Sequence, residues 1–457
     1  MSAEVPRLRQ GKMKTQDRNH EIHIEHDVNV HFEDRRKSIH FFWFMWGIYS
    51  IVSMTKNCFS AAMADIVSEG FMIKSQTELI TSMFYVVYTP LQIVGGIVSD
   101  KFSPERMIKI GLIGGSIANA SIFLFNVFSS NIAVIYPAMM ISWIFNAVVQ
   151  FSIWASIFKV VSSQCCRSDR PRMIFLISLS PSAGFLLSYT IGAVLPNWRL
   201  NFLISSLSLL ILAVVLHFYD RYVDKYMKWD KEVPAVMAEP SGKKYSKSTL
   251  SLFLSSGFIL LLVTLFLRDA VGAIIRRIAS TMLDDLFDVG PSIGNLMSTL
   301  IVGISIIGIF VAREILKHNL VKNQVVGIIV ALAITTVFAV LFIFAPNVGT
   351  NVILMCLIAG ITTATGLFSN TISSAFVRYG KNATAAGLAN AAVSLGYIAP
   401  LIAVLIEEHS NWTVVKIVIA AAAALSVVTT LLVLPLYNKF KKKEEEEDRL
   451  AEAAEAK

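Results

Sequence analysis

The segment IHFFWFMWGIYSIVSMTKNCFSAAMADI, residues 39–66, decides the fold class of this protein. Between His40 and Asp65 its only charged side chain is that of Lys56. A run of about 20 mostly apolar residues crosses the hydrocarbon core of a bilayer as a helix. An ammonium group inside such a helix costs about 2.5–3.5 kcal/mol on insertion scales. Lys56 must therefore reach an interface or face a group that needs a cation.

The rest of the chain repeats this apolar pattern. Of its 457 residues, 55% are hydrophobic and only 16% are charged. The composition predicts an all-α membrane protein with twelve transmembrane helices. The predicted spans are residues 39–63, 77–99, 105–128, 132–158, 172–195, 198–220, 250–275, 291–312, 321–345, 351–377, 383–406 and 412–437. We expect a multi-pass protein of the plasma membrane, which is the inner membrane if the source is a bacterium.

Basic residues indicate the orientation of these helices. Lys and Arg gather in the even-numbered short loops, as at Lys101, Arg106 and Lys159, and are scarce in the odd-numbered ones. Because basic loops stay on the cytoplasmic side, both termini are predicted to be cytoplasmic. The formal charge of +8 then reflects membrane topology, and we expect no nucleic-acid partner.

The longest polar connector divides the predicted spans into two sets of six. We expect a cytoplasmic tail at 1–38, one six-helix half at 39–220, a cytoplasmic linker at 221–249, a second half at 250–437 and a charged cytoplasmic tail at 438–457. An offset of 212 residues aligns Lys56 with Arg268, and Gly96 with Gly308. The halves are therefore predicted to be pseudo-symmetric, with one cation from each half at the same depth.

The loop after the second predicted span resembles a known signature. Residues 95–111 read GGIVSDKFSPERMIKIG, and this segment is similar to the signature loop of the major facilitator superfamily. Gly96 matches the glycine of that loop, Asp100 its carboxylate and Lys101 its cation, and Arg106 follows. The resemblance implies the twelve-helix fold of that superfamily and a conformational switch at this loop.

Two segments resemble the organophosphate:phosphate antiporter branch of the superfamily. KNCFSAAM (56–63) places Lys56 where that branch has an arginine, and LRDAV (267–271) places Arg268 at its second phosphate-binding cation. The resemblance implies that these two side chains bind phosphate. The lysine departs from the pattern, because an ammonium is a point charge whereas a guanidinium binds phosphate through two parallel hydrogen bonds.

A third similar segment is WIFNAVVQFSIW, residues 143–154. Asn146 and Gln150 lie one helical turn apart on one face, with Trp143 and Trp154 on much the same face. These side chains are predicted to bind substrate hydroxyls or to stack on the substrate. Contacts between helices are the alternative for both amides, and packing is the alternative for both tryptophans.

Few ionisable residues lie deep in the predicted spans. Lys56, Arg268 and Asp269 supply two cations and one acid, a set that favours a dianionic ligand. Asp269 is predicted to balance charge or to couple transport. Adjacent helical positions point about 100° apart, so Arg268 and Asp269 need not pair. Arg276 and Arg277 are expected at the outer end of their span, as headgroup anchors rather than an entry funnel.

Together with these residues, the resemblance to the antiporter branch implies a carrier that exchanges an organic phosphate ester for inorganic phosphate. Spans 1 and 4 contain no carboxylate, and Arg268 should keep Asp269 ionised, which favours anion exchange over proton coupling. A carboxylate carrier, a proton-coupled carrier and a non-transporting sugar-phosphate receptor remain alternatives. We expect no enzymatic activity, no metal and no cofactor. The expected partners are a small anion and the lipid bilayer, and the expected state is a monomer.

Overall fold

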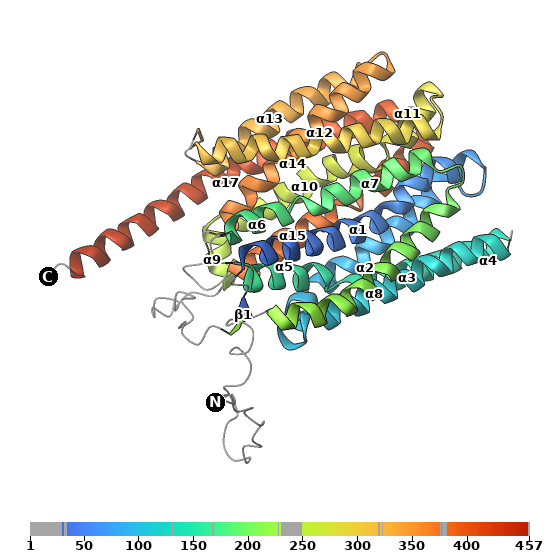
Figure 1. The fold of residues 1–457 in the computed structure, drawn as a ribbon. Coiled ribbons are helices and arrows are strands. Elements are labelled where there is room, and N and C mark those ends of the chain that lie inside the picture. Colours follow the sequence, from blue (N-terminus) through green and yellow to red (C-terminus); the bar gives the residue numbers. More distant parts are fainter. Residues whose placement is uncertain are drawn as a thin grey trace, which may run out of the picture.

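The computed structural model describes residues 30–31, 34–129, 131–166, 169–226, 228–229, 249–318, 320–321, 323–374, 376 and 382–455. Within these ranges the protein is a bundle of long helices that run side by side (Figure 1). Strands are limited there to β1 (Val30–His31) and β2 (Lys228–Trp229), which pair antiparallel. The predicted all-α class is confirmed.

The helices fall into two groups along the chain. The first group is α1 (Arg35–Ser68), α2 (Lys74–Lys101), α3 (Pro104–Phe128), α4 (Ile132–Gln150), α5 (Ile153–Gln164), α6 (Arg170–Ile177), α7 (Ser180–Val194) and α8 (Arg199–Tyr226). The second group is α9 (Thr249–Ser255), α10 (Phe258–Arg277), α11 (Ala279–Phe287), α12 (Pro291–Lys317), α13 (Gln324–Ile343), α14 (Val348–Ser374), α15 (Asn382–Gly396), α16 (Ala399–His409) and α17 (Trp412–Glu455).

Several predicted spans are broken by a change of backbone direction. The run at 250–275 divides into α9 and α10 at Gly257, whose φ of 76° lies in the left-handed region that glycine adopts without a Cβ clash. The run at 383–406 divides before Pro400, in the first turn of α16. Because proline has no backbone N–H, a helix commonly restarts there.

Ten helical segments in the described part of the chain are long and apolar enough to cross a membrane. Large apolar side chains such as Ile141, Ile211 and Ile307 lie exposed on them, as lipid-facing residues do. The first two predicted spans, in α1 and α2, are absent from these ten segments. Polar residues such as Asn57 in α1 and Glu78 in α2 make those helices less apolar. The count of twelve crossings and the cytoplasmic position of the termini therefore stay predictions.

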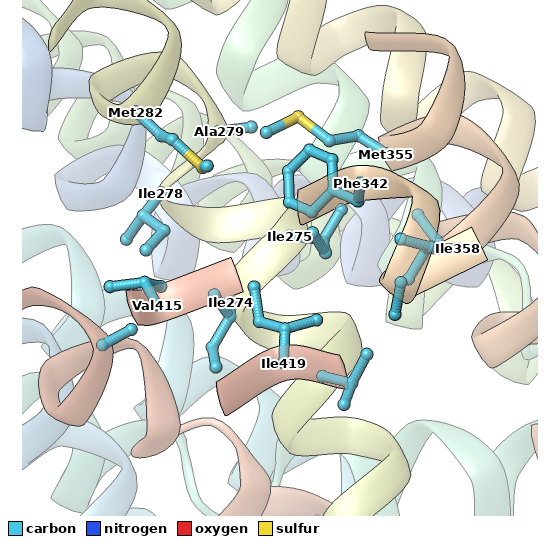
Figure 2. Packing of buried hydrophobic residues seen from close by; sticks show 14 of the residues in the cluster. Ile274, Ile275, Ile278, Ala279, Met282, Phe342, Met355, Ile358, Val415 and Ile419 are labelled. Carbon is cyan, nitrogen blue, oxygen red and sulfur yellow. The ribbon is translucent and has the colours of Figure 1, made fainter. Parts of the chain in front are cut away.

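The two groups each have their own apolar clusters. In the second group, Ile274 and Ile275 of α10 pack with Phe342 of α13 and with Met355 of α14 (Figure 2). The groups meet where α7 contacts α12 and where α2 contacts α15 and α16. The predicted domain boundaries stay a prediction, because residues 230–248 of the linker lie outside the described residues.

Candidate functional site

A cavity of about 320 Å³ lies between the two groups of helices. From the first group it is lined by residues of α1, α2, α5 and α7, and from the second by residues of α10, α12, α14 and α15. Lys56, Arg268, Asp269 and Arg276 all face it. Three cations and one carboxylate give its wall an excess of positive charge.

Lys56 lies on the α1 wall of the cavity. Its side chain is buried, with 7% of its surface exposed, so it does not extend to an interface. The ammonium donates a hydrogen bond to the Tyr88 hydroxyl over 2.9 Å and lies 4.3 Å from the centre of the same ring. No described carboxylate lies within ion-pair distance of it. An aromatic face stabilises a desolvated cation without neutralising it, so Lys56 keeps its charge available to a ligand.

Arg268 lies across the cavity on α10 and does pair with its neighbour. Its Nε donates to Asp269 Oδ2 over 2.8 Å, and its Nη2 contacts the same oxygen. The angle between adjacent helical positions left this pairing open, and in the structure the two side chains do pair. The arginine side chain is long enough to bend back, and a low dielectric favours the ion pair.

Arg276 is a third cation on the cavity wall. Its side chain is 8% exposed, and its Nη1 donates to Thr363 Oγ1 over 3.2 Å. Its Nη2 lies 4.0 Å from Asp269 Oδ1, so one carboxylate stands between two guanidinium groups. The prediction of a headgroup anchor is wrong for Arg276, because its side chain folds into the protein.

Arg277 is also buried, but it points away from the cavity wall. Its side chain has 0% exposure, and its Nη2 lies 2.9 Å from Oε1 of Glu78 in α2, whose side chain is equally buried. It also donates to the Tyr397 carbonyl oxygen and to Ser60 Oγ, over 2.6 and 3.1 Å. The anchor prediction is thus wrong here as well. Glu78 lies at the start of the second predicted span and is a second fully buried carboxylate. Sequence reasoning missed it, although a charge in an apolar run was the available signal.

Further ion pairs join the helix groups at the end of the bundle that holds α11, called the α11 end below (Figure 1). Lys74 of α2 donates to Asp285 over 2.5 Å and to Glu407 over 3.1 Å. Burial alone lowers the pKa of Lys74, but its hydrogen bonds and the charges of these carboxylates outweigh that effect and raise it. The α11 end is therefore held together by charges from both groups.

The predicted residues of the fourth span divide between cavity and packing. Trp154 lines the cavity and lies against Tyr49, with ring centres 4.6 Å apart. Trp143, Asn146 and Gln150 are fully buried and are absent from the cavity wall. Gln150 donates to Asn146 Oδ1 over 2.7 Å, within α4. Their placement corresponds to the alternative of packing and helix contacts.

The predicted switch loop is only partly described. Gly96, Asp100 and Lys101 belong to the last turns of α2, and the surroundings of these three residues lie outside the described part of the structure. Arg106 is exposed in the first turn of α3. The switch at this loop stays a prediction.

Sequence reasoning missed the uncharged polar lining of the cavity. Gln92 of α2 accepts hydrogen bonds from Asn390 and Ser394 of α15, both over 3.0 Å. Tyr85 stacks on Tyr397, with ring centres 4.9 Å apart. Such residues are common in membrane helices, so no local pattern distinguishes them. In the described ranges no three His, Cys, Asp or Glu side chains are grouped as a metal site would require.

Long apolar helices around a central cationic cavity define a multi-pass membrane protein of the carrier class. Residues 45–399 match the Major Facilitator Superfamily. The match covers more than half of the chain, and the chain therefore belongs to this superfamily of membrane transporters rather than to an enzyme family.

Curated relatives match shorter stretches. Over 195 residues the chain is 25% identical to the membrane sensor protein UhpC of Salmonella typhimurium, covering 42% of each chain. Over 223 residues it is 23% identical to a probable hexose phosphate transport protein of Chlamydia muridarum, covering 47% of this chain and 43% of that one. The matched stretches thus span less than half the length of these relatives, both of which are bacterial.

Solved structures share the fold over most of the chain. A bacterial homologue of the human lysosomal transporter Spinster, inward-facing and unoccupied, has a TM-score of 0.71 at 13% identity, covering 89% of this chain and 99% of that chain. The nucleoside transporter NupG has a TM-score of 0.62 at 13% identity, covering 85% and 99%. At such identity these structures support the fold alone.

Proposed function

We propose that the protein is a secondary carrier that exchanges an organic phosphate ester for inorganic phosphate. The observation that carries this proposal is that Lys56 of α1 and Arg268 of α10 line one cavity, one from each group of helices. A ligand bound to both side chains contacts both groups at once. Alternating access by rocking of two helix groups requires such a central site.

The chemistry of the wall fits a phosphate monoester. Guanidinium and ammonium groups both donate charge-assisted hydrogen bonds to phosphate oxygens. Tyr85, Gln92 and Asn390 offer aromatic and amide surface to the organic part of the ester. The similarity to a probable hexose phosphate transport protein supports a sugar phosphate.

The charge of the wall supports exchange rather than one-way movement. An excess of cations in a low-dielectric cavity is unfavourable unless an anion is bound. Loaded carrier therefore changes conformation more readily than empty carrier, and each passage of one anion favours the return of another. Inorganic phosphate is the second anion in this proposal.

A sensor is the second candidate, because two relatives carry the name membrane sensor protein UhpC. A sensor would bind sugar phosphate in the same cavity without moving it. Counterflow separates the two functions, since only a carrier accumulates label inside vesicles. A carrier of carboxylates is the remaining alternative. It is favoured by Lys56, because a lysine does not form the two parallel hydrogen bonds to phosphate that an arginine forms.

The test is counterflow in proteoliposomes loaded with inorganic phosphate, with labelled phosphate outside and sugar phosphates or carboxylates as competitors. We expect Lys56→Ala and Arg268→Ala each to lower uptake by about 10- to 100-fold, because each removes a charge-assisted hydrogen bond worth about 1.5–3 kcal/mol. Lys317→Ala, which removes an exposed lysine at the end of α12, is the matched control and should leave uptake unchanged.

Each outcome of this experiment is decisive. Phosphate uptake supports the proposal if a sugar phosphate competes with it and if both cavity variants lower it as expected. Binding of a sugar phosphate without uptake identifies a sensor. Uptake of a carboxylate without phosphate exchange overturns the proposal and favours the rival carrier.

A further inference from the structure

Asp269 stands between two arginines on one helix. Arg268 holds its Oδ2 by a 2.8 Å hydrogen bond from Nε, and Arg276 Nη2 lies 4.0 Å from its Oδ1. Arg276 is seven residues further along α10, which is about two helical turns and therefore the same face. All three side chains line the cavity. The carboxylate thus has a bound cation on one side and a nearby cation on the other.

Gly272 makes this arrangement possible. A Cβ atom at Gly272 would lie 2.6 Å from Arg276 Nη1 and 2.9 Å from its Nη2, and both distances are shorter than real Cβ contacts show. The Arg276 side chain therefore folds back over the bare backbone of Gly272, toward Asp269. The neighbour that an added methyl would meet is the far end of a flexible side chain. An alanine at this position would move the guanidinium with little effect on the helix.

We infer that Asp269 is an internal counter-ion that moves from Arg268 to Arg276 when the phosphate group of the substrate binds Arg268. This inference rests on the proposed function, since it assigns the exchange to the same cavity. In the empty cavity Asp269 neutralises Arg268. When the phosphate group replaces Asp269 as the partner of Arg268, the carboxylate of Asp269 pairs with Arg276. No anion is then left unpaired beside the ligand.

The exchange makes Asp269 a competitor of every anionic ligand for Arg268. A ligand must compete with a carboxylate for Arg268, and a dianion competes better than a monoanion, because its attraction to the cation is stronger. The cavity should therefore prefer phosphate monoesters and inorganic phosphate to singly charged phosphate diesters. Asp269 acts through the arginines and need not touch the substrate, so it is a positioning residue.

The test is equilibrium binding of inorganic phosphate and of dimethyl phosphate, a monoanion, at pH 8 to the purified full chain in detergent. Wild type should bind phosphate more tightly. In Asp269→Asn the competing carboxylate is lost, so both ligands should bind more tightly. Its negative charge repels a dianion more strongly than a monoanion, so the preference for phosphate should rise by about tenfold, which corresponds to about 1.4 kcal/mol. A merely structural role for Asp269 would weaken both ligands equally.

A double-mutant cycle tests the exchange itself. Gly272→Ala should weaken phosphate binding severalfold in the wild-type background, because Arg276 no longer receives Asp269, and should have no effect in the Asp269→Asn background. If Gly272→Ala does not fold, as judged by size-exclusion chromatography, Arg276→Gln replaces it. An equal effect in both backgrounds overturns the exchange. Failure of the wild type to bind either ligand instead overturns the proposed function, and this inference with it.

Discussion

Arg268 and Arg277 lie on the same helix, and each pairs with a carboxylate, but the two pairs differ in what they join. Arg268 binds the next residue of its own helix, at the wall of the cavity. Arg277 binds Glu78 of α2, so its pair links the two groups of helices, and both side chains are fully buried. Side-chain rotation can therefore open the first pair without helix movement, whereas separation of α2 from α10 would break the second.

The two arginine–carboxylate pairs are therefore suited to different roles. A pair that a ligand reaches without helix movement suits binding. A buried pair between groups suits a closed state, because its separated charges would each be desolvated without a partner. Tyr397 and Ser60 add neutral hydrogen bonds to Arg277. We therefore expect the Glu78–Arg277 pair to set the stability of the closed α11 end, and the Arg268–Asp269 pair to set ligand affinity.

The largest effect is expected from Glu78→Ala. The substitution leaves the Arg277 charge buried without a counter-ion, which costs about 3–5 kcal/mol in free energy of unfolding. Thermal unfolding in detergent measures it. Asp269→Ala is the matched control: it leaves Arg268 facing the cavity rather than the packed interior, and should lower the melting temperature much less. Equal losses in the two variants would contradict the division of tasks.

A smaller effect is expected from Lys74→Ala at the α11 end. Lys74 contacts Asp285 and Glu407, but it is partly exposed, with 17% of its side chain accessible. Pairs near the surface contribute about 0–1 kcal/mol and are screened by salt. Melting temperatures at low and high salt measure the contribution. A loss of stability as large as that of Glu78→Ala would show that burial does not determine how much each ion pair stabilises the fold.

The smallest effect is expected from the exposed pair of Arg35 and Asp169. Arg35 Nε donates to Asp169 Oδ2 over 2.7 Å, and this hydrogen bond is the main cause of the lowered pKa of Asp169. A folded-state pKa below the unfolded one adds stability above the unfolded pKa, about 3.9. That contribution is lost as pH falls through the folded pKa.

Unfolding measured between pH 3 and pH 6 in wild type and Asp169→Asn isolates this contribution. The two proteins should differ slightly near pH 6 and converge at the acid end. A difference that grows as the pH falls would contradict the sign of the shift.

The sequence by itself determined the helical membrane fold and the importance of Lys56 and Arg268. Both conclusions depend on local properties: apolar runs of sufficient length predict spans, and a cation within such a run is costly enough to need a purpose. The structure then places both cations at one cavity. The same local reasoning placed Arg276 at a headgroup, because it measured distance along the helix and not the direction of the side chain.

Only the tertiary structure decided which residues from distant parts of the chain contact each other. Glu78 and Arg277 are far apart in the chain, and nothing near either residue identifies the other. Asn146 and Gln150 share a helix face as predicted, but the packing of α4 turns that face away from the cavity. Helical periodicity shows which residues lie together on one helix. Which neighbour that face meets depends on how distant helices pack, and that arrangement has no local signature.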